Sequence, residues 1–159
     1  MARFMRKGIT RFYFLPTIAS TALAPTVAEI TAGERLDPEL AEVNGFMFSN
    51  SPIQTPDMAS AFVSQIPGED TVEDSNLVFY EDDTDNPVYD AQTKGTVGFI
   101  VIFPKGIAGA TPATGDDCDV WPVQVASSSR QYTADNEAGK YEIVYTPTDP
   151  PELDTAVLA

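Results

Sequence analysis

The sequence predicts a mainly β fold, a β-sandwich or barrel flanked by one or two short helices. Thirteen prolines and ten glycines divide the 159 residues into short segments, which favours short strands over long helices. Residues 95–104, GTVGFIVIFP, are apolar and largely β-branched or aromatic, with no polar face. Such a run is typical of a strand that is buried on both sides within a sheet. We expect the other strands to pack around it.

The segments before this run alternate between predicted strands and turns. Ile9–Leu15 is expected to be the first strand, ended by Pro16, and its alternate residues face opposite sides of the sheet. Residues 25–33 are expected to form a short helix, because proline near the start and glycine at the end are typical of helix termini. Strands are also predicted over Val43–Ser49, with Gly45 as a candidate bulge, and over Ala59–Ile66.

A Pro67-Gly68 turn and an acidic loop, Glu69–Asp74, are expected next, before a strand over Leu77–Tyr80. Asp85 or Asn86 is predicted to cap a short helix over 87–92, with Pro87 at its first position.

After the central run, Cys118–Val125 is predicted to be an edge or bulged strand, because Pro122 cannot donate a ladder hydrogen bond. Ser127–Ser129 is expected to be mobile or to turn. Tyr141–Tyr145 is predicted to be the last strand.

The length indicates one domain, residues 1–159. Its ends, residues 1–8 and 146–159, are interpreted as extended arms, which suit a subunit of an assembly.

Charge is distributed unevenly along the chain. Residues 1–28 contain four basic residues and no acidic one, whereas residues 29–159 contain all 24 acidic residues and five basic ones, a net charge of 5 − 24 = −19. Adhesive binding to DNA or to an anionic membrane is therefore disfavoured. The same field would suit a surface past which a polyanion slides, although an ordinary solvated acidic surface is the simpler interpretation.

No catalytic set, metal site or cofactor site emerges, and we predict that the protein is not an enzyme. The chain has no histidine and one cysteine, Cys118, which excludes Ser–His and Cys–His pairs and a disulfide framework. Cys118 lies among aspartates that disfavour its thiolate, so a structural role is favoured. Residues 83–88 do not continue as an EF-hand loop. Whether an ion binds at Asp116–Asp119 is left open.

Alternatives remain for Trp121 and for the N-terminus. Trp121 is expected in the core, with sugar stacking as the alternative, and an enzyme that uses paired carboxylates remains a distant third possibility. Residues 1–24 have the outline of a signal peptide, although their apolar part is short and interrupted by polar residues. The corresponding alternative is a secreted β-sandwich binding module, for example one that binds carbohydrate.

Six segments in order along the chain carry a resemblance to a known family. They are 8–20 (GITRFYFLPTIAS), 24–37 (APTVAEITAGERLD), 39–46 (ELAEVNGF), 55–82 (TPDMASAFVSQIPGEDTVEDSNLVFYED), 95–104 and 118–127 (CDVWPVQVAS). The series resembles the major tail tube proteins of long-tailed (siphovirus) bacteriophages, in particular those that infect actinobacteria. Residues 82–90 depart from the pattern, because the helix there is short and acidic.

This resemblance implies a structural virion protein that forms a homo-oligomer of stacked rings, each of six subunits, whose acidic lumen conducts viral DNA during ejection. Its partners would be itself and other tail proteins, without membrane insertion, and it would be made in the host cytoplasm. The inner hairpin maps onto Val43–Ser49 and Ala59–Ile66, joined by Ser49–Met58. Four acids are candidates for the lumen or ring edge: Glu69, Asp70, Glu73 and Asp74.

Overall fold

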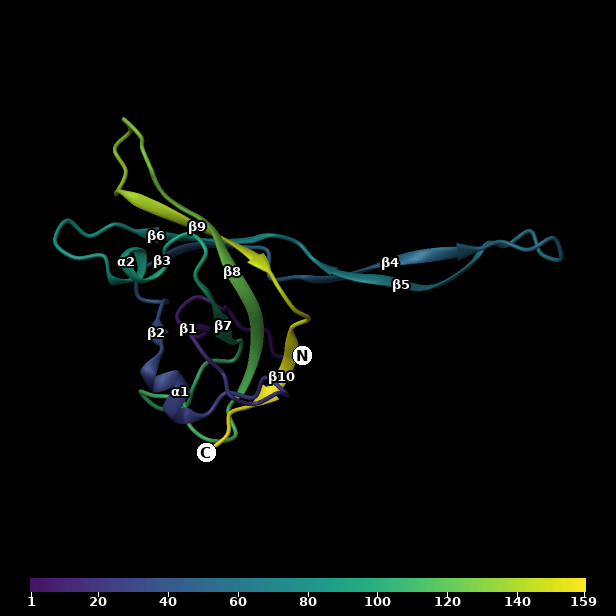
Figure 1. Cartoon of the computed structure of the whole chain (residues 1–159), viewed down its shortest axis with the longest axis horizontal. Helices are drawn as coiled ribbons and strands as arrows, with labels where there is room; N and C mark the ends of the chain where they lie inside the picture. The colour runs from purple at the N-terminus through teal and green to yellow at the C-terminus, as the bar shows by residue number, and fades with distance from the viewer.

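The computed structural model describes residues 1–159 and is built on one antiparallel eight-stranded sheet (Figure 1). Seven strands follow the order β2-β1-β7-β8-β9-β6-β3, and β10 pairs with β8 beside this path. β4 and β5 form a separate two-stranded sheet. The strands are β1 (Arg11–Leu15), β2 (Glu34–Arg35), β3 (Leu40–Asn44), β4 (Phe48–Thr55), β5 (Ser64–Val72), β6 (Ser75–Tyr80), β7 (Val97–Phe103), β8 (Asp117–Gln131), β9 (Lys140–Pro147) and β10 (Glu152–Ala156). The predicted mainly β fold is confirmed.

β7, the predicted central strand, lies between β1 and β8 and is covered on both faces. Ile100 belongs to a core cluster of twelve buried residues on one face, and Val101 and Phe103 belong to a cluster of eight on the other. β1 alternates in the same way, because Phe14 enters the first cluster and Leu15 the second. A strand between two cores needs no polar face, which explains the uninterrupted apolar run.

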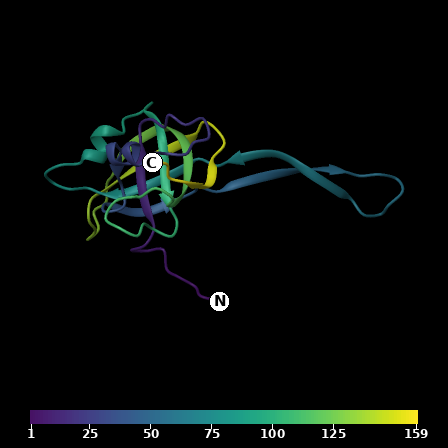
Figure 2. The ribbon, with the colours of Figure 1, turned by 90° about the horizontal axis from the view of Figure 1, so that it is seen from below.

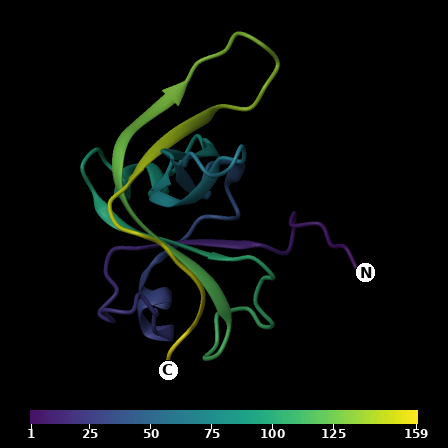
Figure 3. The ribbon, with the colours of Figure 1, turned by 90° about the vertical axis from the view of Figure 1, so that its right-hand side faces the viewer.

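β8 is the longest strand and joins the two halves of the sheet. One edge pairs with β7, and the other pairs first with β10 and then with β9. Figure 3 shows how strongly β8 and β9 bend where they cross the body. The register shifts between Val125 and Ser127, a bulge of the kind that bends a strand.

The prediction for Ser127–Ser129 was wrong: this segment is neither mobile nor turning, because it pairs with β9. The segment with Pro122 was predicted to be an edge or bulged strand. β8 is not an edge strand, because Pro122 pairs with Phe99 inside the sheet, and its bulge lies between Val125 and Ser127 rather than at Pro122. The Pro122 carbonyl accepts a hydrogen bond from the Thr148 amide, and the amide and carbonyl of one strand residue point to the same edge. The missing donor therefore faces the junction between β10 and β9.

The two helices, α1 (Val27–Ala32) and α2 (Pro87–Ala91), lie within the predicted ranges, and α2 begins at Pro87 as predicted. Thr26 caps α1 through a capping box with Glu29: the Thr26 hydroxyl accepts from the Glu29 amide at 3.2 Å, and the Glu29 carboxylate accepts from the Thr26 amide at 2.8 Å. Asn86 precedes α2 and Pro87 opens it, although the Asn86 side chain makes no capping bond. Neither helix is long and apolar enough to cross a membrane.

The predicted strand Val43–Ser49 is interrupted. β3 ends at Asn44, and β4 begins at Phe48. Gly45 and Phe46 both have positive φ, +86° and +56°, which turns the chain out of the sheet rather than forming a bulge. A Cβ on Gly45 would also come within 2.8 Å of the Ser75 Cα. The returning strand is likewise displaced from Ala59–Ile66 to Ser64–Val72.

Pro67 and Gly68 do not form the predicted turn, because they lie inside β5. The β4–β5 register shifts between Ser51 and Ile53, so Pro67 and Gly68 sit opposite Pro52 in a bulge. A bulge leaves an unpaired backbone position, which tolerates a proline without an amide hydrogen. The expected acidic loop is consequently strand up to Val72 and loop only at Glu73 and Asp74.

The ends of the chain differ in their packing. Residues 1–6 have no regular structure and are exposed, and Figure 2 shows this segment leaving the body. At the other end, Tyr141–Tyr145 lies in β9, but β9 is not the last strand. Glu152–Ala156 forms β10 on β8, Val157 is buried, and Leu158 bridges to Thr26. Most of the segment interpreted as a C-terminal arm is thus docked on the chain's own sheet.

Candidate assembly surface

The β4–β5 hairpin projects from the body as a long, narrow ribbon (Figures 1 and 2). Its strands pair with each other and with no other strand. No side chain between Phe48 and Val72 is buried. An isolated two-stranded ribbon is marginally stable in water, so this one is suited to docking on another surface.

Cross-strand pairs organise the two faces of the hairpin. On one face lie the Ile53–Ile66 pair, each about half exposed, and the hydrogen-bonded Thr55–Ser64 and Ser49–Thr71 pairs. On the other face, Asn50 donates to the Asp70 carboxylate at 2.5 Å. Ser–Thr and β-branched pairs hold the ribbon together without burying it.

Exposed apolar side chains are concentrated along the hairpin. Met58 and Phe62 at its tip are 103% and 76% exposed. The tip nevertheless has local order, since the Asp57 carboxylate accepts from the amides of Ala59 and Ser60, at 2.8 and 3.0 Å. Contiguous exposed apolar side chains on a projecting element mark a protein interaction site.

A groove of about 350 Å³ lies where the hairpin meets the body. It is lined by Phe48 and Val72, the pair at the base of the hairpin, by Pro147 at the end of β9, and by Pro150 shortly after it. Asp70 and Asp149 also line it. The groove thus combines apolar walls with two carboxylates.

The four predicted acids all lie at the base of the hairpin but in two settings. Glu69 and Asp70 are on β5, opposite Ser51 and Asn50. Glu73 and Asp74 form the exposed connection to β6. None of the four is in an ion pair.

Sequence reasoning missed the apolar side chains of the hairpin and the groove. The sequence carried no local signal for either feature, because the exposure of these side chains and the meeting of Asp70 with Asp149 depend on how the hairpin leaves the body.

The remaining candidates have structural positions. The Asp116 carboxylate accepts from the Ala113 amide at 2.8 Å, and that of Asp119 accepts from the Asp154 amide at 2.9 Å, so these aspartates hold loop backbone. No three acidic, histidine or cysteine side chains converge as a metal site. Cys118 is fully buried, and burial, followed by the fields of Asp119, Asp117 and Asp116, raises the pKa of its thiol to about 12. The structural interpretation of Cys118 is confirmed.

Trp121 is 5% exposed and lies in the first core cluster, edge-on to Phe46 at 5.7 Å between ring centroids. The core interpretation is therefore confirmed, since a sugar-stacking ring must be open to solvent. Nearby, the hydroxyl of buried Tyr145 donates to the side-chain carbonyl of buried Gln92. This bond ties the end of α2 to β9.

We compared the chain with family models, with curated proteins and with solved structures. A family model described as "Phage tail tube protein" matches residues 1–159. No curated protein matches the sequence.

Among solved structures, the chain is similar to the sheath/tube terminator of an extracellular contractile injection system (PVC) in the extended state. The TM-score is 0.64 and the sequence identity is 12%, and the match covers 95% of this chain and 96% of that chain. A chain of the anti-feeding prophage baseplate gives 0.62 at 6% identity, covering 98% of each chain. The tail of an empty GTA particle gives 0.53 at 10% identity, covering 96% of this chain and 98% of that chain. At these identities the likeness concerns the fold.

Proposed function

The chain belongs to the phage tail tube protein family, and from that premise we propose that it is the repeating subunit of a tail tube, closing into rings of six that stack around a DNA-conducting lumen. Membership in a family of structural virion components makes it a tail protein rather than an enzyme. The ring size is supported by the sixfold symmetry stated for two structural neighbours, the baseplate and the GTA tail. The assignment to a siphovirus of actinobacteria rests on the sequence resemblance.

The observation that carries this proposal is the unsupported β4–β5 hairpin. Every side chain on it is at least partly exposed, and its tip presents Met58 and Phe62 to solvent. Fully burying one such side chain contributes roughly 1.5–3 kcal/mol. Repeated in every subunit, this contact would drive self-association, and pairing the hairpin would protect its strand edges from aggregation.

The acidic charge supports the proposed DNA path. A net charge of −15, if directed into a lumen, would keep a polyanion from adhering to the wall while it passes. Glu69, Asp70, Glu73 and Asp74 are the acids that we assign to the lumen or the ring edge.

The position of residues 11–15 is relevant to the alternative in which residues 1–24 are a cleaved signal peptide. They form β1 between β2 and β7, and Phe14 and Leu15 contribute to both core clusters. Removing residues 1–24 would remove β1 and leave one edge of β7 without its partner strand. The strand interpretation therefore takes precedence over a secreted module.

Self-assembly is tested by negative-stain electron microscopy and light scattering of the purified protein at rising concentration. We expect rings or hollow tubes from the unmodified protein and none from the Met58→Ser/Phe62→Ser variant. The variant should keep the circular dichroism and melting temperature of the parent, because its changed side chains lie in the exposed tip. Tyr132→Ser, which removes an equally exposed aromatic side chain outside the hairpin, is the control. Tubes from the tip variant at parental concentration would refute the role of the hairpin.

A further inference from the structure

The N-terminal arm, residues 1–7, presents basic and apolar side chains together. Met1 and Met5 are exposed, and Phe4 is 54% exposed. The Arg6 guanidinium lies 5.6 Å from the centre of the Phe4 ring. It also donates to the Pro104 carbonyl at 3.2 Å, which fixes the root of the arm to the end of β7. Residues 1–5 extend beyond this anchor, away from the body (Figures 2 and 3).

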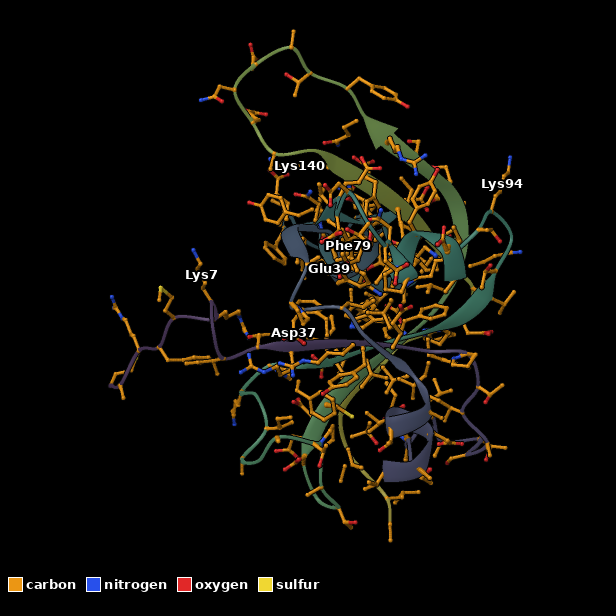
Figure 4. All side chains as sticks on the ribbon, turned by 90° about the vertical axis from the view of Figure 1, so that its left-hand side faces the viewer. Lys7, Asp37, Glu39, Phe79, Lys94 and Lys140 are labelled. Carbon is orange, nitrogen blue, oxygen red and sulfur yellow. The ribbon has the colours of Figure 1, made fainter.

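The basic residues of the arm have no acidic partner in their own chain. The three ion pairs of the molecule use Arg11, Arg35 and Arg130. Arg3, Arg6 and Lys7 take part in none, and the first acidic residue of the chain is Glu29. Figure 4 shows Lys7 on the projecting arm, far from Lys94 and Lys140.

The groove at the base of the hairpin has the complementary character. Its carboxylates, Asp70 and Asp149, are in no ion pair, and Asp70 is bonded only to the neutral amide of Asn50. Its walls, which include Phe48 and Val72, are apolar. A ligand with an aromatic side chain beside cationic ones matches both features, because complementary potentials select a partner and fix its register.

We propose that residues 1–7 of one copy of this chain bind in the groove at the base of the β4–β5 hairpin of a second copy, with Phe4 against the apolar walls and Arg3, Arg6 and Lys7 beside Asp70 and Asp149. This inference rests on the proposed function, which supplies the second copy. It assigns three of the six basic residues that are in no ion pair to the contact between subunits, where they offset the mutual repulsion of like-charged bodies.

The first test is charge reversal with rescue. The arm variant Arg3→Glu/Arg6→Glu/Lys7→Glu and the groove variant Asp70→Lys/Asp149→Lys should each raise the protein concentration required for tubes by about tenfold or more, as expected when charged contacts across an interface become repulsive. The combined variant should recover most of that loss, because the pairs are restored with opposite polarity. A reversal of Asp135 and Glu137 to lysine, in the exposed β8–β9 loop, is the control for net charge.

The outcomes separate the two proposals. Tubes from both single-site variants at parental concentration, or no rescue in the combined variant, would overturn the arm–groove contact and leave the tail tube function standing. Absence of rings and tubes from the unmodified protein at every concentration would instead count against the proposed function.

The second test identifies the contact directly. Tubes assembled from an equal mixture of isotopically light and heavy protein are treated with a carbodiimide, which joins a lysine amine to a carboxylate in contact with it. We expect mass spectrometry to find Lys7 joined to Asp70 or Asp149 in mixed light–heavy peptides. Cross-links only within one isotopic form would place the arm in its own groove and refute the proposal, as would cross-links from Lys7 to other acids alone.

Discussion

The Cα of Gly98 lies so close to the ring of Phe14 that a Cβ on Gly98 would overlap the Cζ and Cε2 atoms of that ring and come within 2.9 Å of the Leu15 carbonyl oxygen. Gly98 is on the central strand β7, and Phe14 is on its neighbour β1. The glycine that interrupts the apolar run is therefore required for close packing between these strands.

Gly98→Ala should destabilise the protein by about 1–3 kcal/mol, the usual cost of overpacking a core. Gly109→Ala is the matched control, since a Cβ there would meet only the Thr111 carbonyl oxygen at 3.8 Å. Urea unfolding of both variants measures the difference. Equal midpoints for the two variants would show that the Phe14 ring moves aside at no cost.

Tyr145→Phe should destabilise the protein by about 1–3 kcal/mol, because it leaves the buried Gln92 carbonyl without its donor. Gln92→Met should leave the Tyr145 hydroxyl unpaired in the same way. The double variant should lose less free energy of unfolding than the sum of the losses of the two single variants, since neither partner then remains buried and unsatisfied. Additive costs in this thermodynamic cycle would contradict the coupling.

Glu34→Gln should raise the melting temperature at neutral pH. Burial first, and then the nearby Glu39, raise the pKa of Glu34. A carboxyl whose pKa is raised on folding stabilises the protein below its unfolded pKa, and this contribution is lost as the pH rises through the folded pKa. The charged form at neutral pH is thus the unfavourable one.

Melting curves between pH 3 and pH 8 measure this effect. In a domain of this size, a change of about 1 kcal/mol in stability shifts the melting temperature by roughly 2–4 °C. The gain from Glu34→Gln should vanish below about pH 4, where Glu34 is protonated in both states. Glu137→Gln, in an exposed loop, should change little at any pH. A gain that persists unchanged at acid pH would exclude the ionisation of Glu34 as its cause.

The Cys118 thiol should not react with an aromatic disulfide reagent at pH 8 while the protein is folded. It is fully buried, and its pKa is raised to about 12, so both access and the reactive thiolate are suppressed. One thiol per chain should react at once in guanidinium. A Ser60→Cys variant, with the new thiol in the exposed hairpin tip, provides the reactive control. Rapid labelling of the native parent protein would show that the β8 region opens.

Glu69→Lys/Asp70→Lys should leave the monomer folded, because both side chains are exposed and such surface changes usually alter stability little. We expect it to change tube yield or the passage of DNA. Retention of a short fluorescent duplex by sedimented tubes separates the two effects, since lysines in the lumen would hold DNA that the parent releases. Unchanged yield, infectivity and DNA retention would remove these two acids from the lumen and the ring edge.

Local interactions made several elements predictable from the sequence. The capping of α1 by Thr26 and Glu29 spans three residues, and Pro87 at the start of α2 acts through its own backbone. Tyr141, Ile143 and Tyr145 lie on one face of β9 because side chains alternate along a strand. β7 could be identified as central because an apolar run without a polar face is stable only between two cores.

The hairpin and the candidate site were decided only by tertiary structure. Pro67-Gly68 and Pro122 look like turn or edge signals when read locally, yet both lie within strands. Pro67 and Gly68 form a bulge of β5 opposite Pro52, and Pro122 faces the gap at the β9–β10 junction. Ser127–Ser129 is held in β8 by the ladder to β9. The groove joins Asp70 to Asp149, far apart in sequence. The sequence by itself determined the two helices, the central strand β7 and the uneven charge, because these depend on neighbouring residues. Tertiary structure decided which strands leave the sheet and which acids meet, because these depend on pairings between residues distant in the chain.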